Sequence, residues 1–177
     1  PFAQARERLG EALLRTQVLA GAYRLVDGRN TPGVSLDDSQ APVVHLVATG
    51  AVMPEVLLAA QELAQEGVIA HVVEVTSPGR LYGSWQRTLK QGIRTASTPS
   101  FPGALRPIFT ERAPIVSVHD GASHAMSWLG SALGMPQVAM GVDTFGQSGT
   151  IADLYRIHDL DSGSIVNGAL AALSLNV

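Results

Sequence analysis

Three side chains of this 177-residue chain have the types and the order of a serine hydrolase triad. Ser123 is the centre of residues 121–125, Gly-Ala-Ser-His-Ala, which approximates the G-x-S-x-G turn that exposes a nucleophilic serine between a strand and a helix. Asp143 and His158 follow in the chain order of the α/β-hydrolases. However, the fifth position of the turn is alanine, no glycine-rich oxyanion loop precedes it, and only 35 positions separate the serine from the histidine. We therefore favour a structural interpretation, in which Ser123 caps a helix and His124 lies in its first turn, and keep a small serine hydrolase as an alternative.

Two short turns suggest a second chemistry, the binding of an anion. Residues 48–52 (Ala-Thr-Gly-Ala-Val) and 119–123 (His-Asp-Gly-Ala-Ser) each place a glycine between a strand-like run and a helix-like run. Backbone N–H groups at a helix N-terminus attract phosphate. Neither turn contains the complete glycine-rich pattern of a dinucleotide or mononucleotide site. We expect a structural turn at both places, with a free-standing anion- or nucleotide-binding module as the alternative.

The five histidines do not predict a metal site. His45 and His71 lie inside apolar, strand-like runs, where each is expected to be a core residue with one satisfied ring nitrogen. No pair of histidines has the spacing of ligands on one helix face, although residues far apart in sequence can converge. We predict no metal-binding, cofactor-binding or catalytic residue in this chain. The five are His45, His71, His119, His124 and His158.

The composition limits the partners and the compartment. Hydrophobic residues make up 46% of the chain and charged residues 15%, which is typical of a folded domain. With a net charge of −3 and no basic run, we expect no nucleic-acid partner. There is no cysteine and no apolar stretch of the roughly 20 residues that cross a bilayer, so we expect a cytoplasmic protein without a membrane partner. Because the sequence does not begin with Met, we also expect a trimmed or excised piece of a longer chain.

The elements that would position these residues alternate between strand and helix. Apolar runs at residues 43–50 and 69–77 predict two buried parallel strands. Between them, residues 53–55 (Met-Pro-Glu) begin a helix with an apolar stripe, and Gly67 ends it. A strand, a helix and a second strand form a parallel βαβ unit.

The remaining segments extend the same pattern. We predict a helix over residues 5–17, a strand and turn within 18–28, a strand at 114–120, a helix over 123–133, and a strand at 137–142. Thr150 and Asp153 predict a helix start, and a last helix is expected to bury one face. That face comprises Ile165, Val166, Ala169, Leu170 and Leu173. The result is an α/β domain with a mostly parallel sheet covered by helices on both sides.

Several of these segments together resemble a known family. Residues 141–173 contain Asp-Thr-Phe-Gly-Gln-Ser, similar to a D-x-F-G-x-S turn, and residues 18–25, 43–64 and 114–120 fit the preceding strands and helix. Over residues 18–174 the chain resembles the C-terminal domain of the transketolase superfamily. Within it, the greatest similarity is to the homodimeric pyruvate dehydrogenase decarboxylase component, an oxidoreductase. The resemblance implies a three-layer α/β fold whose sheet has about five strands, one of them an antiparallel edge strand.

The resemblance also implies what this chain lacks. Enzymes of this superfamily bind thiamine diphosphate and Mg²⁺ between two upstream domains, using a Gly-Asp-Gly motif and a later asparagine. This chain has no Gly-Asp-Gly, and its only asparagines are Asn30, Asn167 and Asn176. It therefore resembles the third domain alone, with residues 1–33 as a leading helix and edge strand and residues 34–177 as the α/β domain. By the same resemblance it is inactive alone, assembles with the thiamine-binding domains of its own chain, and belongs to a homodimer.

The turn that is most specific to the family is also our candidate for an interface. Phe145, Gly146, Gln147 and Ser148 combine an aromatic side chain with a glycine that permits close approach of another backbone. We expect this turn at a homodimer contact. The alternative is that Phe145 fills the local core.

Overall fold

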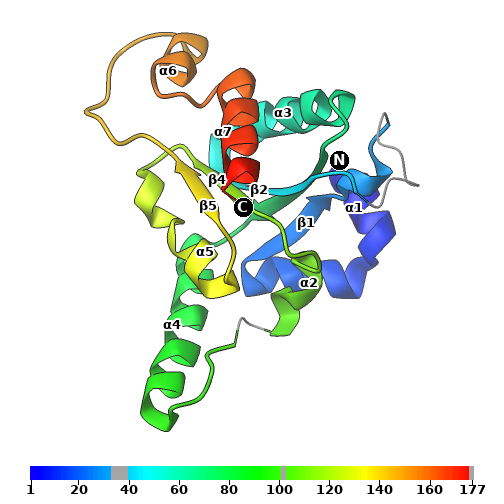
Figure 1. Cartoon of the computed structure of the whole chain (residues 1–177), viewed down its shortest axis with the longest axis vertical. Coiled ribbons are helices and arrows are strands. Elements are labelled where there is room, and N and C mark those ends of the chain that lie inside the picture. Colours follow the sequence, from blue (N-terminus) through cyan, green and yellow to red (C-terminus); the bar gives the residue numbers. More distant parts are fainter. Residues whose placement is uncertain (33–39, 101–102, 176–177) are drawn as a thin grey trace.

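The protein is described here by a computed structural model that places residues 1–32, 40–100 and 103–175 (Figure 1). Five strands form one sheet in the order β1-β3-β2-β4-β5. Strand β1 pairs antiparallel with β3, and the other neighbouring pairs are parallel. The strands are β1 (Ala22–Val26), β2 (Val43–Thr49), β3 (Ile69–Val75), β4 (Ile115–His119) and β5 (Gln137–Met140). The predicted mostly parallel sheet with one antiparallel edge strand is confirmed. The expected boundary between residues 33 and 34 falls outside the described residues.

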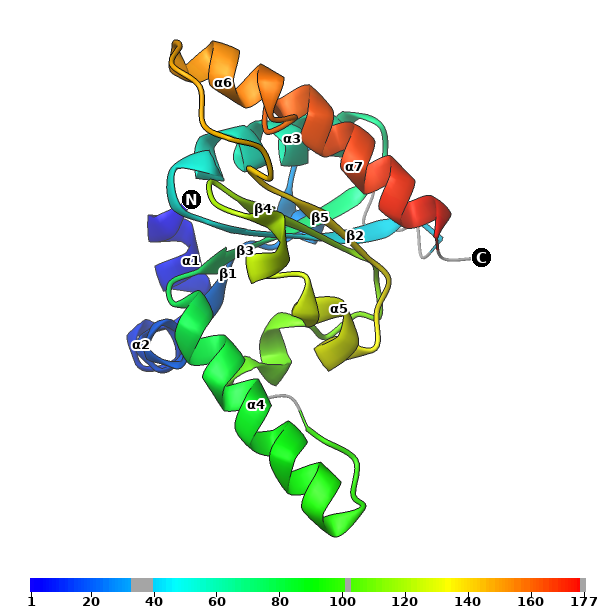
Figure 2. The same ribbon diagram turned by 90° about the vertical axis from the view of Figure 1, so that its left-hand side faces the viewer.

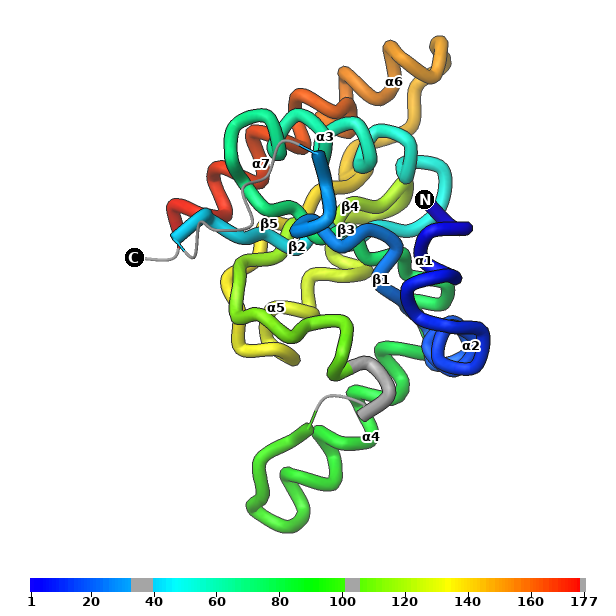
Figure 3. Tube along the Cα trace, turned by 90° about the vertical axis from the view of Figure 1, so that its right-hand side faces the viewer, coloured from blue at the N-terminus to red at the C-terminus, as the bar shows by residue number. Residues whose placement is uncertain are grey.

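Helices cover both faces of this sheet, giving three layers (Figure 2). Helices α3 (Met53–Gln65) and α7 (Ser162–Ser174) lie on one face. The other face carries α5 (Trp128–Leu133) and the first turns of α4 (Pro78–Thr95). Helices α1 (Phe2–Leu9) and α2 (Glu11–Ala20) lie beside the edge strand β1, and α6 (Ile151–Ile157) lies at the outer end of α7 (Figures 1 and 3). The described residues also form four short 3₁₀ turns: η1 (Gly28–Asn30), η2 (Gly50–Val52), η3 (Gly103–Ile108) and η4 (Ser123–Ala125).

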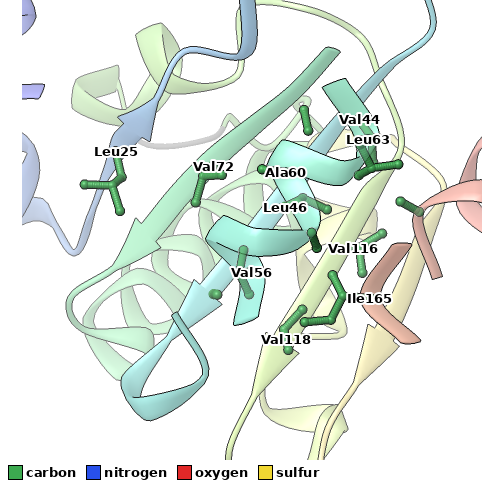
Figure 4. Packing of buried hydrophobic residues seen from close by; sticks show 14 of the residues in the cluster. Leu25, Val44, Leu46, Val56, Ala60, Leu63, Val72, Val116, Val118 and Ile165 are labelled. Atoms are coloured by element: carbon green, nitrogen blue, oxygen red, sulfur yellow. The ribbon is translucent and has the colours of Figure 1, made fainter. Parts of the chain in front are cut away.

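The larger core lies between the sheet and the pair α3 and α7 (Figure 4). The predicted stripe of α3 (Val56, Ala59, Ala60 and Leu63) is buried. It packs on β2 and β3, whose continuous apolar runs fit burial on both faces. In α7, Ile165, Val166 and Ala169 are buried as predicted, but Leu170 is 39% exposed. Ala172 occupies the buried face in its place, because it follows Ile165 by two helical turns.

Two predicted helices are interrupted. The helix expected over residues 5–17 is two helices, since Gly10 adopts a left-handed φ of 74° between α1 and α2. Helix α2 also extends to Ala20, so the strand begins only at Ala22. The helix expected over residues 123–133 is divided into η4 and α5.

A distant side chain explains this second interruption. In a continuous helix, the N–H of Gly130 would donate to the carbonyl oxygen of Met126. Instead, the Gln137 side chain lies between them: its Oε1 accepts from Gly130 N at 2.6 Å and its Nε2 donates to Met126 O at 3.0 Å. Gln137 belongs to β5, so the interruption depends on tertiary structure and has no local signal in residues 123–133.

Candidate functional site

The ends of β2, β4 and β5 meet at the carboxyl edge of the sheet, where open α/β sheets usually bind ligands. In this chain, side chains of the domain itself occupy the place where a ligand would bind. Gly50 has a φ of +80°, and a Cβ at this position would lie 2.8 Å from Asp120 Oδ2. The same carboxylate oxygen accepts a hydrogen bond from Ala51 N at 3.2 Å. Two features therefore favour glycine at position 50: the left-handed backbone conformation and the Asp120 carboxylate that lies against it.

The carboxylate of Asp120 argues against an anion site in residues 48–52. It takes the backbone donor that a phosphate would need and places a negative charge there. In the turn at 119–123, two backbone donors are likewise taken, since Gly121 N donates to His119 Nδ1 at 2.8 Å and Ser123 N donates to Asp143 Oδ1 at 2.9 Å. Both turns have the structural role predicted for them, and the anion-binding alternative has no support.

The proposed hydrolase residues do not assemble into a triad. Ser123 and Asp143 come together directly, and hydrogen bonds from Ser123 lower the pKa of the exposed Asp143 carboxyl. A triad requires an imidazole between the two, as the base that accepts the serine proton. His158 instead lies with Nδ1 3.5 Å from Thr144 Oγ1, and His124 is exposed within η4.

The structural role predicted for Ser123 is also wrong in detail. The N-cap residue of η4 is Ala122, and no side chain caps that turn. Ser123 instead links η4 to the segment after β5, because both its backbone N–H and its side chain hydrogen-bond to the Asp143 carboxylate. By contrast, the helix start predicted at Thr150 is confirmed, because its Oγ1 accepts from Asp153 N at 3.2 Å.

The two buried histidines form part of a polar cluster that the sequence did not predict. His45 and His71 are fully buried and stacked, with ring centroids 5.5 Å apart. The Nε2 of His45 donates to Glu111 O at 3.0 Å, while its Nδ1 has no partner among the described residues, as predicted. Burial lowers the pKa of His45 to about 4.

His71 differs from the prediction, since both of its ring nitrogens are engaged. Its Nδ1 lies 3.1 Å from Gly28 N and 3.2 Å from Asp27 Oδ1, and its Nε2 lies 3.0 Å from Glu111 Oε1. The contact with His71 is the main cause of a lowered Asp27 pKa of about 2. Arg29 pairs with both carboxylate oxygens of Glu111, at 3.1 and 2.6 Å, and is the main cause of a lowered Glu111 pKa.

This cluster joins the turn after β1, the strands β2 and β3, and the segment before β4. Its carboxylates are paired with histidine and arginine, and among the described residues no three His, Cys, Asp or Glu side chains are arranged to hold a metal ion. The cluster therefore has a structural role, which is to hold residue 111 against strands β2 and β3.

The turn predicted as an interface lies on the surface. Residues 143–150 are all exposed, and Phe145 is 95% exposed. The alternative that Phe145 fills the local core is therefore wrong. The adjoining helix α6 has no buried residue and exposes Ile151 (71%) and Ile157 (53%). These three residues, Phe145, Ile151 and Ile157, are the large apolar side chains that the segment exposes, and we refer to them as the apolar patch.

The apolar patch is positioned from the two ends of its segment. On one side, Val142 N donates to Gly121 O at 2.8 Å, next to a Gly141 whose Cβ would lie only 2.5 Å from that same oxygen. On the other side, the fully buried Leu160 connects α6 to α7, and Asp161 caps α7 by accepting from Ser164 N at 3.1 Å. The segment between these anchors lies outside the three layers (Figures 1 and 2).

Within the described ranges, no helix has the length and apolar character to cross a membrane.

Comparison with known proteins identifies one family. The family model of the transketolase-like TK C-terminal domain matches residues 21–161. The chromosomal transketolase of Cupriavidus necator is 30% identical over 141 residues, which is 80% of this chain and 18% of that relative. The chain thus spans less than a fifth of this curated relative.

Solved structures show the same fold. The transketolase of Leishmania mexicana superposes with a TM-score of 0.56 at 20% identity, over 89% of this chain and 18% of that one. The transketolase of Campylobacter jejuni gives 0.55 at 20% identity, over 86% and 18%. A split-gene transketolase, described as an inactive beta4 tetramer, gives 0.50 at 22% identity, over 77% and 41%. From the matched family model and this shared architecture, we conclude that the chain belongs to the family of transketolase-like C-terminal domains.

Proposed function

We propose that this chain is the assembly and support domain of a thiamine diphosphate-dependent enzyme and that it is not catalytic alone. The observation that carries the proposal is the apolar patch. Its three large side chains are 53–95% exposed on a small domain with few charged residues. Large apolar side chains exposed along one short segment are typical of a contact surface. In our proposal, Phe145, Gly146, Gln147 and Ser148 lie at a two-fold homodimer contact.

The split-gene transketolase supports both parts of this proposal. That protein shares the fold and is described as inactive and as a tetramer. We infer likewise that the present chain self-associates without the rest of an enzyme and lacks activity by itself. Residues 1–33 would then lead from upstream thiamine-binding domains into the α/β domain of residues 34–177.

Among the described residues, the carboxyl edge of the sheet does not fit thiamine diphosphate and its metal. A diphosphate needs backbone or cationic donors, but at the carboxyl edge the donors Ala51 N and Ser123 N are taken by the carboxylates of Asp120 and Asp143. These two negative charges oppose a phosphate. We therefore propose that other domains hold any cofactor of the longer enzyme, and we assign no residue here to it.

The type of the longer enzyme has two candidates. The relatives named above are transketolases, which favours a transferase. The turn at residues 143–148 resembles that of the pyruvate dehydrogenase decarboxylase component, which favours a 2-oxo acid dehydrogenase. A cytoplasmic location is part of the proposal, since a chain without cysteine does not depend on an oxidising compartment.

Sedimentation equilibrium of the wild-type chain tests the assembly role. We expect weak self-association at high micromolar concentration, and a strictly monomeric chain would contradict the proposal. Assays with thiamine diphosphate, Mg²⁺ and pyruvate, using ferricyanide as electron acceptor, are expected to show no turnover. Hydrolysis of a p-nitrophenyl ester that is lost in Ser123→Ala would instead support the hydrolase.

A further inference from the structure

Helix α4 carries a concentration of positive charge that the proposed function does not use. Four of the 12 Lys and Arg residues lie in this helix, and none of the 15 Asp and Glu residues does. The four cations are Arg80, Arg87, Lys90 and Arg94, separated by seven, three and four positions. These spacings place all four on one face of the helix. At 1.5 Å per residue, they form a cationic stripe about 21 Å long.

The stripe has no acidic partner in the described structure. All four side chains belong to exposed residues. Arg80 Nη1 donates to Leu19 O at 2.8 Å, a backbone oxygen. Arg87, Lys90 and Arg94 make no hydrogen bond or ion pair with any residue in the described ranges. Only Arg94 lies in the last turn, so the helix dipole accounts for one cation at most.

The helix carries this stripe away from the body. Its first turns are anchored by Leu81 and Trp85, which are 3% and 7% exposed, and Tyr82 packs against the Trp128 ring at 5.4 Å. Near its end, Gly92 is buried, and its carbonyl oxygen accepts from Ser97 N at 3.0 Å. Beyond its first turns the helix projects out of the three layers (Figures 2 and 3).

Apolar side chains flank the stripe. Ile93 is 73% exposed and Tyr82 is 45% exposed, and both lie between the stripe and the buried side of the helix. A surface that combines cations with exposed apolar side chains suits a protein segment that carries carboxylates and some apolar groups.

The charge of the remaining chain decides between classes of anionic partner. Outside α4 the chain has eight basic and fifteen acidic residues, a formal net charge of −7. Nucleic acids and anionic membranes are attracted by the charge of a large protein surface, and outside α4 that net charge is negative. A short acidic segment contacts the stripe alone. We propose that the α4 stripe of Arg80, Arg87, Lys90 and Arg94 is a docking site for an acidic protein segment.

The test measures binding of a fluorescein-labelled hexaglutamate peptide to the full 177-residue chain by fluorescence anisotropy. Six extended residues span about 20 Å, which matches the stripe. One variant combines Arg87→Gln, Lys90→Gln and Arg94→Gln. Its control combines Arg6→Gln, Arg15→Gln and Arg156→Gln, which removes the same charge from α1, α2 and α6. Circular dichroism verifies that both variants are folded.

We expect the wild type and the control to bind alike, and the α4 variant to bind about ten-fold more weakly, because three exposed ion pairs are lost. Added salt should weaken the wild-type binding. Equal binding by the two variants, or no binding by the wild type, overturns the proposal. Tighter binding of a DNA duplex or of phosphatidylserine vesicles at the same salt would assign the stripe to nucleic acid or membrane instead. Loss of self-association in the α4 variant alone would identify a second copy of the chain as the occupant.

Discussion

The replacement of Phe145 by serine tests whether this side chain lies at a homodimer contact or is simply exposed to solvent. Phe145 is 95% exposed in the single chain, so Phe145→Ser should change the free energy of unfolding by no more than about 0.5 kcal/mol. Full burial of a phenylalanine side chain contributes about 1.5–3 kcal/mol. A two-fold contact contains the residue twice, so the variant should lose about 3–6 kcal/mol of association free energy. At about 1.4 kcal/mol per factor of ten, the dissociation constant rises at least about a hundredfold.

Sedimentation equilibrium at high micromolar concentration measures this change, and urea denaturation verifies that the variant is folded. Ile93→Ser is the matched control, because Ile93 is 73% exposed on α4, at the opposite end of the molecule from α6 (Figure 2). We expect the control to associate like the wild type and Phe145→Ser to be monomeric. A similar loss of association in both variants would refute the placement of the contact at residues 145–148.

Three further predictions concern stability, measured as the free energy of unfolding in urea. Ser123→Ala should cost less than about 0.5 kcal/mol, because the variant keeps the backbone N–H bond to Asp143 and loses only a side-chain hydrogen bond to an exposed carboxylate. Gly50→Ala should cost about 2 kcal/mol and Gly134→Ala about 1, since both have a left-handed φ but only Gly50 faces a carboxylate. For His45, the folded pKa of about 4 lies below the unfolded value of 6.5, so its contribution is complete above pH 6.5 and is lost as the pH falls from 6.5 to 4. The wild type should lose about 2.5 kcal/mol from this group between pH 7.5 and 4.5, and His45→Gln should lack that part of the pH dependence; an unchanged profile in the variant would contradict it.

The features that could be predicted from the sequence are those that depend on the residue pattern within a single helix or strand. The apolar runs of β2 and β3 and the stripe of α3 follow from periodicity within a single element. The start of α6 at Thr150 follows from a capping pair three residues apart. The antiparallel pairing of the edge strand was predicted from the family resemblance and not from the residue pattern.

The features that the sequence did not predict depend on contacts between distant segments. Gln137 of β5 interrupts the helix expected at residues 123–133, and nothing within that helix indicates it. The polar cluster brings together Asp27, His71 and Glu111, which are at least 40 positions apart. For the turn at residues 145–148, the sequence showed an aromatic residue beside glycine, but the choice between core and surface required the position of α6 outside the layers.

The central claim is that this domain assembles an enzyme and holds no cofactor itself. Calorimetric titration of the full 177-residue chain with thiamine diphosphate in the presence of Mg²⁺ tests it most directly. Because the carboxylates of Asp120 and Asp143 take the donors at the carboxyl edge, we predict no binding heat beyond that of dilution. A dissociation constant in the micromolar range would contradict the account.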